Sequence, residues 1–219
     1  RGIAKVDGKT TFIPFTLPGE TVKFEYTFSK STFDEAKAVK ILKESTDRVE
    51  PVCEYFSICG GCSLQHMSTD AQILHKQDTL INQLKYIGEG VVPESILPPL
   101  KTQNTEMYRN KARLGVRYVN KKEKVLVGFR ERYGRFLADI DSCKVLNKEI
   151  GSKLLIIAKF IEGLSIPTKI AQIEVAVDDT RPALIFRNLE PFTNEDFTKL
   201  KEFGAEHNYW IYLQSKGPD

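Results

Sequence analysis

The four cysteines constrain the possible folds of this chain more than any other feature of its sequence. Cys53, Cys59 and Cys62 form the pattern C-x5-C-x2-C, and Cys143 follows about eighty residues later. Thiols grouped in this way bind metals or metal clusters, or form disulfides. If all four take part in one site, the fold must bring a remote segment onto a compact loop.

Three kinds of chemistry compete for this pattern. Disulfides need an oxidising compartment, but the sequence has neither a secretory leader nor the cysteine density of a small disulfide scaffold. Structural zinc is commonly held by two C-x2-C pairs, whereas this chain has one. A [4Fe-4S] cluster suits three thiolates from one tight loop and a fourth from elsewhere.

The sequence therefore favours a [4Fe-4S] cluster, with zinc and unligated or disulfide-bonded thiols as the alternatives. The four predicted ligands are Cys53, Cys59, Cys62 and Cys143. Gly60 and Gly61 lie between two of them, and glycine lets a backbone fold closely around inorganic sulfide. Because four ligands would close every iron site, the pattern indicates a structural or electron-transfer cluster rather than radical chemistry.

Composition and charge narrow the class of protein. The chain has 219 residues, of which 41% are hydrophobic, and no run of 18 apolar residues predicts a membrane span. It starts at Arg1 without an initiator Met or a leader, so we expect an excised fragment. The net charge is only +3, yet residues 101–135 contain eleven Lys or Arg and three Glu. That window predicts either a polyanion-binding surface or the solvated face of a sheet.

The N-terminal residues alternate in the manner of short strands separated by turns. Asp7-Gly8 and residues 17–20 are turn signals, and strands are predicted at 10–14, 21–26 and 33–42. This spacing predicts a small β-barrel, or a hairpin on a larger sheet. Most aromatic residues of this region are expected in its core rather than exposed for base stacking. They are Phe12, Phe15, Phe24, Tyr26 and Phe33.

The rest of the chain mixes helices and strands. Ser68 is the expected N-cap of a helix whose apolar residues recur at helical spacing as far as Gly88, and residues 91–101 form a connector. Further helices are predicted at 147–164 and 193–207. The predicted strands are 113–119, 124–130, 136–140, 171–177, 183–188 and 209–213. The expected fold class is therefore α+β with a mostly antiparallel sheet.

Several segments resemble one protein family. Residues 53–66, with the sequence CEYFSICGGCSLQH, are similar to the cluster loop of bacterial S-adenosylmethionine-dependent RNA uracil-5 methyltransferases. Residues 2–20 are similar to the TRAM domain of that family, an OB-like RNA-binding barrel. Residues 108–114 (YRNKARL) resemble the basic strand that opens its central domain, and residues 141–146 (DSCKVL) the segment with the fourth cluster ligand. The resemblance runs over nearly the whole chain.

The resemblance implies a domain organisation. A TRAM barrel with a truncated N-terminus would occupy residues 1–47, the iron-sulfur loop 48–66, a helix and connector 67–100, and a central RNA-recognition domain 101–219. The presence of both a cluster and a TRAM domain suggests a member that acts on 23S ribosomal RNA, the expected partner, with paralogues that act on other uridines as the alternative. We expect a cytoplasmic, monomeric protein without a membrane segment.

The resemblance also implies chemistry that this chain does not complete. Methylation of uracil C5 needs a thiolate that adds to C6 and a base that removes the C5 proton. The cluster interpretation leaves no cysteine for this role, and no strand is followed by a G-x-G turn and a helix. The Rossmann-like domain that binds S-adenosyl-L-methionine is therefore expected to be absent, and the fragment alone to be inactive.

RNA recognition is the role left for this part of the enzyme. Arg109, Lys111 and Arg113 alternate with other residues, so on a strand they would project from one face toward phosphates. The resemblance implies that Arg113 lies near the target base. Two other classes remain open: an electron-transfer or redox-sensing iron-sulfur protein, and a zinc-stabilised RNA-binding module.

Overall fold

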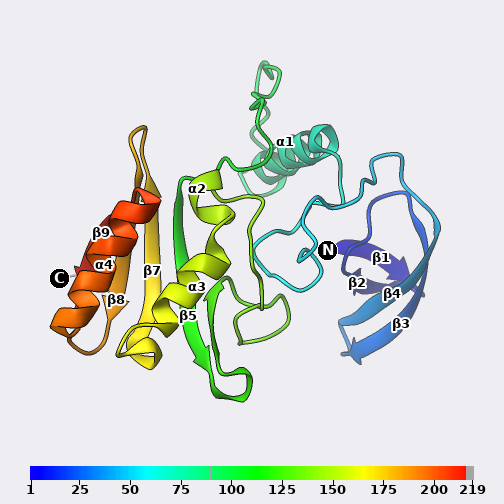
Figure 1. Cartoon of the computed structure of the whole chain (residues 1–219). Coiled ribbons are helices and arrows are strands. Elements are labelled where there is room, and N and C mark those ends of the chain that lie inside the picture. The colour runs from blue at the N-terminus through cyan, green and yellow to red at the C-terminus, as the bar shows by residue number, and fades with distance from the viewer. Residues whose placement is uncertain (89, 216–219) are drawn as a thin grey trace. The chain divides into compact units, whose positions relative to one another are not determined.

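The computed structural model describes residues 1–88 and 90–215, which form two compact units (Figure 1). The first unit comprises Arg1–Val52 and Ser63–Thr102, and the second comprises Cys53–Cys62 and the chain from Gln103 onward. Residue 89 in the predicted connector range and residues 216–219 of the predicted central domain lie outside the described residues. The cysteine loop thus belongs to the second unit, although segments of the first unit flank it in the sequence.

The first unit contains a four-stranded sheet in the order β1-β2-β4-β3. Its strands are β1 (Gly2–Val6), β2 (Lys9–Ile13), β3 (Thr21–Ser29) and β4 (Phe33–Lys43). The β2–β4 pair is parallel and the other two pairs are antiparallel. The predicted turn between β1 and β2 is confirmed, since Asp7 and Gly8 both have positive φ, as a two-residue hairpin turn requires.

The expectation that the aromatic residues of this sheet fill its core is wrong. Tyr26 is 55% exposed, and the other four aromatic residues named above are only partly buried. The buried positions are taken by smaller side chains such as Ile13 and Ala36. Three register shifts between β3 and β4 interrupt the alternation of side chains from which the expectation was drawn.

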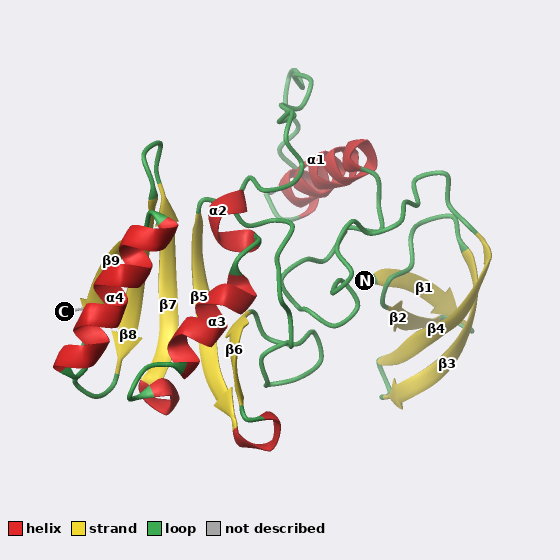
Figure 2. Ribbon diagram, viewed as in Figure 1, coloured by secondary structure: helices red, strands yellow, loops and turns green. Residues whose placement is uncertain are grey.

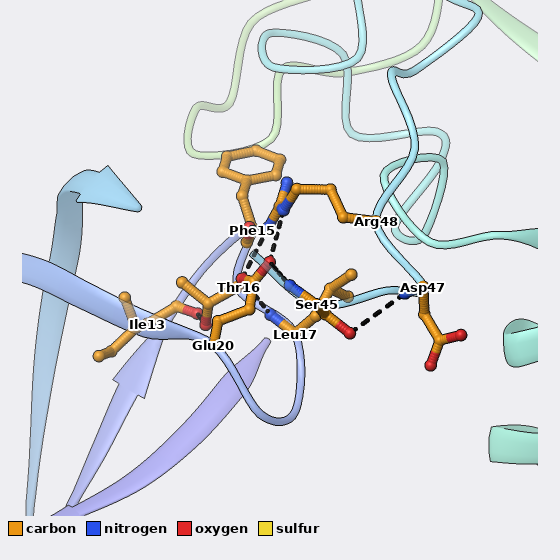
Figure 3. A network of polar contacts seen from close by, with 8 residues as sticks. All are labelled: Ile13, Phe15, Thr16, Leu17, Glu20, Ser45, Asp47 and Arg48. Carbon is orange, nitrogen blue, oxygen red and sulfur yellow. Dashed lines mark hydrogen bonds and ion pairs between the residues drawn. The ribbon is translucent and has the colours of Figure 1, made fainter. Parts of the chain in front are cut away.

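Glu20 and Arg48 join the turn before β3 to the segment after β4 (Figure 3). Arg48 donates to the two carboxylate oxygens of Glu20 from Nε at 2.5 Å and from Nη2 at 2.8 Å. The backbone amides of Leu17 and Ser45 also donate to this carboxylate, and the Glu20 side chain is 1% exposed. A buried carboxylate is therefore matched by four donors, so this network anchors the turn before β3 to the segment after β4.

Helix α1 (Thr69–Tyr86) completes the first unit. The prediction of Ser68 as its N-cap is confirmed, because the Ser68 side chain accepts a hydrogen bond from the Ala71 amide. No residue of α1 is buried, so its apolar stripe remains accessible in the described part of the chain. Among the residues that the structure describes, neither α1 nor any other helix has the length and apolar character needed to cross a membrane.

The second unit contains a five-stranded sheet in the order β6-β5-β7-β8-β9. Its strands are β5 (Lys111–Val119), β6 (Lys124–Gly128), β7 (Ile170–Val177), β8 (Pro182–Asn188) and β9 (Trp210–Gln214). Only the β8–β9 pair is parallel. The expected mixed fold with a mostly antiparallel sheet is confirmed, and so is the hairpin at the 3-10 turn Asn120–Lys122 between β5 and β6.

Helices cover one face of this sheet (Figure 2). They are α2 (Lys148–Gly151), α3 (Leu154–Glu162) and α4 (Asn194–His207), and a second 3-10 turn, Pro167–Lys169, precedes β7. The core between the layers includes Leu114, Ile157, Ile173 and Phe186, all fully buried. Burial of apolar surface contributes about 25 cal/mol per Å², so this core stabilises the unit.

Two predicted elements of the second unit are wrong. The single helix expected at 147–164 is divided into α2 and α3, because the backbone of Lys153 leaves helical geometry. The strand expected at 136–140 is absent, and only an isolated bridge joins Leu137 to Arg130. That segment belongs instead to a loop over residues 129–137 that folds back on itself.

We predict that the Glu20 network makes the first unit sensitive to acid. Burial disfavours the Glu20 carboxylate, but the hydrogen bonds from Arg48, Leu17 and Ser45 prevail and lower the pKa of Glu20 from 4.5 to about 2. This stabilisation is present above pH 4.5 and is lost as the pH falls toward 2. Glu20→Gln should lower the unfolding free energy at neutral pH by about 2 kcal/mol.

The measurement is urea unfolding followed by far-ultraviolet circular dichroism between pH 2 and pH 7. Glu25→Gln, at an exposed position of β3, removes the same charge and is the matched control. Equal midpoints for the two variants at neutral pH would contradict the assignment.

Candidate cysteine centre and nucleic-acid interface

The cysteine loop, residues 53–62, is folded by tight backbone turns. The amide of Phe56 donates to the Cys53 carbonyl at 3.0 Å, and the amide of Cys59 donates to the Tyr55 carbonyl at 2.7 Å. Tyr55 and Cys59 pack against the hydrophobic core of the second unit, while Cys53, Cys59 and Cys62 are each partly buried. The loop is therefore a structured edge of this core rather than a linker.

Arg132, in the loop 129–137, holds the cysteine loop through hydrogen bonds to its backbone carbonyls. Its Nη2 atom donates to the carbonyl oxygens of Phe56 at 3.1 Å and Cys59 at 3.3 Å, and also to that of Cys62. The guanidinium carbon lies 5.1 Å from the centroid of the Phe56 ring, in cation–π range. One cation thus satisfies several loop carbonyls that no strand or helix pairs.

Sequence reasoning missed Arg132, although it lies in the basic window. Its neighbours gave no sign that one of many cations would turn inward. One signal in the sequence could have indicated such a residue. A cysteine loop without regular secondary structure has many unpaired backbone carbonyls, and these need hydrogen-bond donors from another segment.

Of the two glycines of the loop, Gly60 has neighbours that leave little room for a side chain, whereas Gly61 does not. A Cβ atom on Gly60 would lie 3.1 Å from the Arg130 carbonyl oxygen and 3.3 Å from the Arg132 Cα. A Cβ atom on Gly61 would lie 3.4 Å from the Phe129 ring, an ordinary contact. Gly60 therefore allows the close approach of the loop to residues 130–132, where its amide donates to the Arg130 carbonyl at 2.9 Å.

Cys143 reaches the same region from a distant part of the sequence. Its amide donates to the Gly151 carbonyl at 2.7 Å, which fixes the segment before α2. Gly151 lies so close that a Cβ atom there would be 2.3 Å from the Cys143 carbonyl oxygen. Packing between these two backbones thus sets the position of Cys143.

The pKa of the Cys59 thiol depends on its burial, on one backbone amide and on the other three cysteines. Burial raises its pKa, the Gly61 amide that donates to its Sγ at 3.4 Å lowers it, and the nearby Cys143, Cys62 and Cys53 raise it further. Cys59 is thus within electrostatic reach of each of the other three predicted ligands. In the described part of the chain, however, no group of three or more His, Cys, Asp or Glu is arranged as a metal site. The four-cysteine centre stays a prediction.

The donor set nevertheless fits an iron-sulfur group better than a harder metal. Thiolates are the ligands that such clusters prefer, and the surroundings combine apolar packing with a backbone donor to sulfur.

The basic strand is β5, and it carries two of the three predicted RNA contacts. Lys111 and Arg113 are exposed, while Ala112 between them and Leu114 after them are buried beneath the helices. Arg113 pairs with Glu174 at 2.9 Å, and its side chain is 70% exposed. An exposed ion pair stabilises a fold little, so Arg113 remains accessible to a phosphate.

Arg109 lies before the strand begins, so strand alternation does not determine its direction. Its Nε donates to the Lys111 carbonyl at 3.1 Å, and its guanidinium carbon lies 5.7 Å from the Phe129 ring centroid. Arg109 is nevertheless exposed and close to the other two cations in sequence.

Known proteins resemble this chain over its whole length. It is 74% identical to the 23S rRNA (uracil(1939)-C(5))-methyltransferase RlmD of Francisella tularensis subsp. novicida over 219 residues. It is 48% identical to RlmD of Legionella pneumophila strain Corby over 220 residues. In both comparisons the chain is covered completely and the relative to 49%, so the chain spans about half the length of these relatives. No family model matches the sequence.

A solved structure has the same fold. The Pyrococcus abyssi tRNA (uracil-54, C5)-methyltransferase, determined in complex with S-adenosyl-L-homocysteine, matches with a TM-score of 0.61 at 20% identity. The match covers 100% of this chain and 50% of that chain. It supports the mixed α+β architecture.

We predict that Gly151 is essential for the position of Cys143. Gly151→Ala should lower the unfolding free energy of the second unit by about 2 kcal/mol, because the new methyl group meets backbone atoms that have no room to move. Gly163→Ala is the control, since its methyl group would meet only the Phe160 carbonyl oxygen, at 3.4 Å.

The single tryptophan, Trp210, lies in β9 of the same unit, so its fluorescence during urea unfolding reports the transition. If the two alanine variants unfold at the same urea concentration, the packing argument is wrong.

Proposed function

We propose that this chain is the RNA-binding, iron-sulfur-containing half of an S-adenosylmethionine-dependent 23S ribosomal RNA uracil-C5 methyltransferase. The observation that carries the proposal is the 74% identity to an RlmD enzyme along the entire chain. The parent enzyme forms 5-methyluridine in ribosomal RNA. S-adenosyl-L-methionine and the catalytic thiol belong to the half of the relatives' length that this chain does not span.

Cys53, Cys59, Cys62 and Cys143 are the proposed ligands of a [4Fe-4S] cluster. Support comes from the electrostatic influence of the other three cysteines on Cys59, and from the packing of both Cys59 and Cys143 against the same hydrophobic core. When bound, the cluster supplies structural closure or electron transfer. The protein residues around it hold the loop: Arg132 binds its carbonyls, and Gly60 allows the close approach.

RNA is proposed to bind along the exposed face of β5. Arg113 and Lys111 supply phosphate contacts, and Arg109 extends the basic surface before the strand. The first unit is proposed to be a TRAM-type RNA-binding domain. Its small four-stranded sheet, with one parallel and two antiparallel pairings, supports this proposal. We propose that the enzyme works in the cytoplasm as a monomer.

The cluster is tested by anaerobic reconstitution of the chain with iron and sulfide. We expect a brown protein with about four irons per chain and broad visible absorption. Replacing any one of the four cysteines by serine should reduce the iron retained after desalting. Ser57→Ala changes an exposed residue of the same loop and serves as the control. A colourless protein that retains zinc instead would refute the iron-sulfur assignment.

The RNA contact is tested by the affinity of the chain for a uridine-containing ribosomal RNA oligonucleotide at several salt concentrations. Arg113→Ala should weaken binding about tenfold at low salt and make the salt dependence shallower, because one phosphate contact is lost. Glu174→Ala should strengthen binding, since it removes the carboxylate that competes for Arg113. Lys159→Ala removes an exposed cation from α3 on the helical side and should have little effect. Unchanged affinity in Arg113→Ala would rule out this contact.

A further inference from the structure

A groove of about 920 Å³ lies beside β5 in the second unit. Arg113, Gly115 and Arg117 of β5 line it along one strand face. Residues of β6 and of the loop 129–137 line one side, and Ala171 and Gln172 of β7 line the other. The groove therefore extends the exposed strand face that carries Arg113 into a concave surface.

The loop 129–137 forms a defined wall of this groove. The amide of Glu131 donates to the Phe136 carbonyl at 2.9 Å, and the amide of Ala138 donates to the Phe129 carbonyl at 2.9 Å. Leu137 lies over β5, where a Cβ atom on Gly115 would be 2.7 Å from its Cδ2 atom. Glycine in the middle of a strand here gives the loop room to approach the sheet.

The groove is strongly basic. Five cations line it, against the single carboxylate of Glu131. They are Arg113, Arg117, Lys122, Arg130 and Arg135. Lys122 is paired with Asp139 at 2.6 Å, and Arg113 with Glu174. Within the described residues Arg117, Arg130 and Arg135 form no salt bridge, and all three are exposed. Three guanidinium groups are thus available for an anionic chain.

An exposed aromatic ring accompanies these cations. Phe136 lines the groove and is 64% exposed, and the Arg135 guanidinium carbon lies 5.5 Å from its ring centroid. Aromatic rings beside arginines are typical of sites for single-stranded nucleic acids, where bases stack on the ring and phosphates meet the cations. In a duplex the base faces are already stacked on one another, so a duplex cannot use the ring.

The outer side of the same loop is fixed to the cysteine loop. The Arg132 amide donates to the Ile58 carbonyl at 2.8 Å, and the Gly60 amide donates to the Arg130 carbonyl at 2.9 Å. The Arg132 side chain adds the carbonyl contacts described above. Arg132 is therefore a positioning residue: it points away from the groove and holds the loop that carries Arg130, Arg135 and Phe136.

We propose that this groove is a binding site for single-stranded RNA, in which Phe136 stacks on a base and Arg117, Arg130 and Arg135 contact phosphates. The proposal rests on the proposed function and adds to it a segment of RNA beyond the contact with Arg113. It also distinguishes two kinds of contact, which differ in their dependence on salt.

The test measures binding of this chain to a fluorescent single-stranded RNA and to a duplex of the same length. Phe136→Ala should weaken single-strand binding about tenfold with an unchanged salt slope, and leave duplex binding unaltered. Phe136→Trp should retain affinity. Arg117→Ala and Arg135→Ala should each weaken binding and make the salt slope shallower by about 0.7. Lys159→Ala is the control for loss of one positive charge.

A 2-aminopurine base in the RNA reports stacking directly. Its fluorescence should be quenched on binding to the unmodified chain and to Phe136→Trp, but not to Phe136→Ala. If Arg113→Ala weakens binding while the Phe136, Arg117 and Arg135 variants do not, the groove proposal fails and the proposed function stands. If the chain binds no RNA, both fail. Equally tight binding of polyglutamate, unaffected by Phe136→Ala, would indicate an acidic protein partner and overturn the groove proposal.

Discussion

The contact between Arg132 and the cysteine loop supports both candidate sites of the second unit. A flexible loop rich in unpaired carbonyls would not hold three thiols in a fixed arrangement, and the guanidinium group supplies donors to three of those carbonyls. The same residue belongs to the loop that forms a wall of the basic groove. The proposed cluster site and the proposed RNA site therefore lie on opposite sides of one loop, and a change in one is expected to reach the other.

Alternate side chains of β5 serve two purposes, because one set packs in the core and the other set is exposed for binding. Ala112, Leu114 and Val116 enter the core under the helices, whereas Lys111 and Arg113 face away from it. Within the described residues of the second unit, helices cover one face of the five-stranded sheet (Figure 2), and the exposed cations of β5 lie on the opposite face. The exposed cations contribute little to stability, so this face can be specialised for binding at small cost to the fold.

The proposed role of the cysteines also explains the division of labour in the proposed enzyme. Thiolates that hold a cluster are not available to add to uracil C6, so the chemical step needs a thiol from the rest of the parent protein. The relatives are about twice as long as this chain, which leaves room for such a part. Recognition and catalysis would then reside in separate halves of one polypeptide.

Local patterns in the sequence determined the elements whose signals lie within a few residues. The Ser68 cap, the hairpin before β6 and the alternation of β5 were all predictable, because capping, turns and side-chain direction depend on near neighbours. Spacing also pointed to the four cysteines as one set. Only the tertiary structure decided where the long helix breaks, at Lys153, whose backbone leaves helical geometry between α2 and α3. It also decided that one arginine of a basic window turns inward while its neighbours line a groove, since both outcomes depend on carbonyls and surfaces contributed by remote segments.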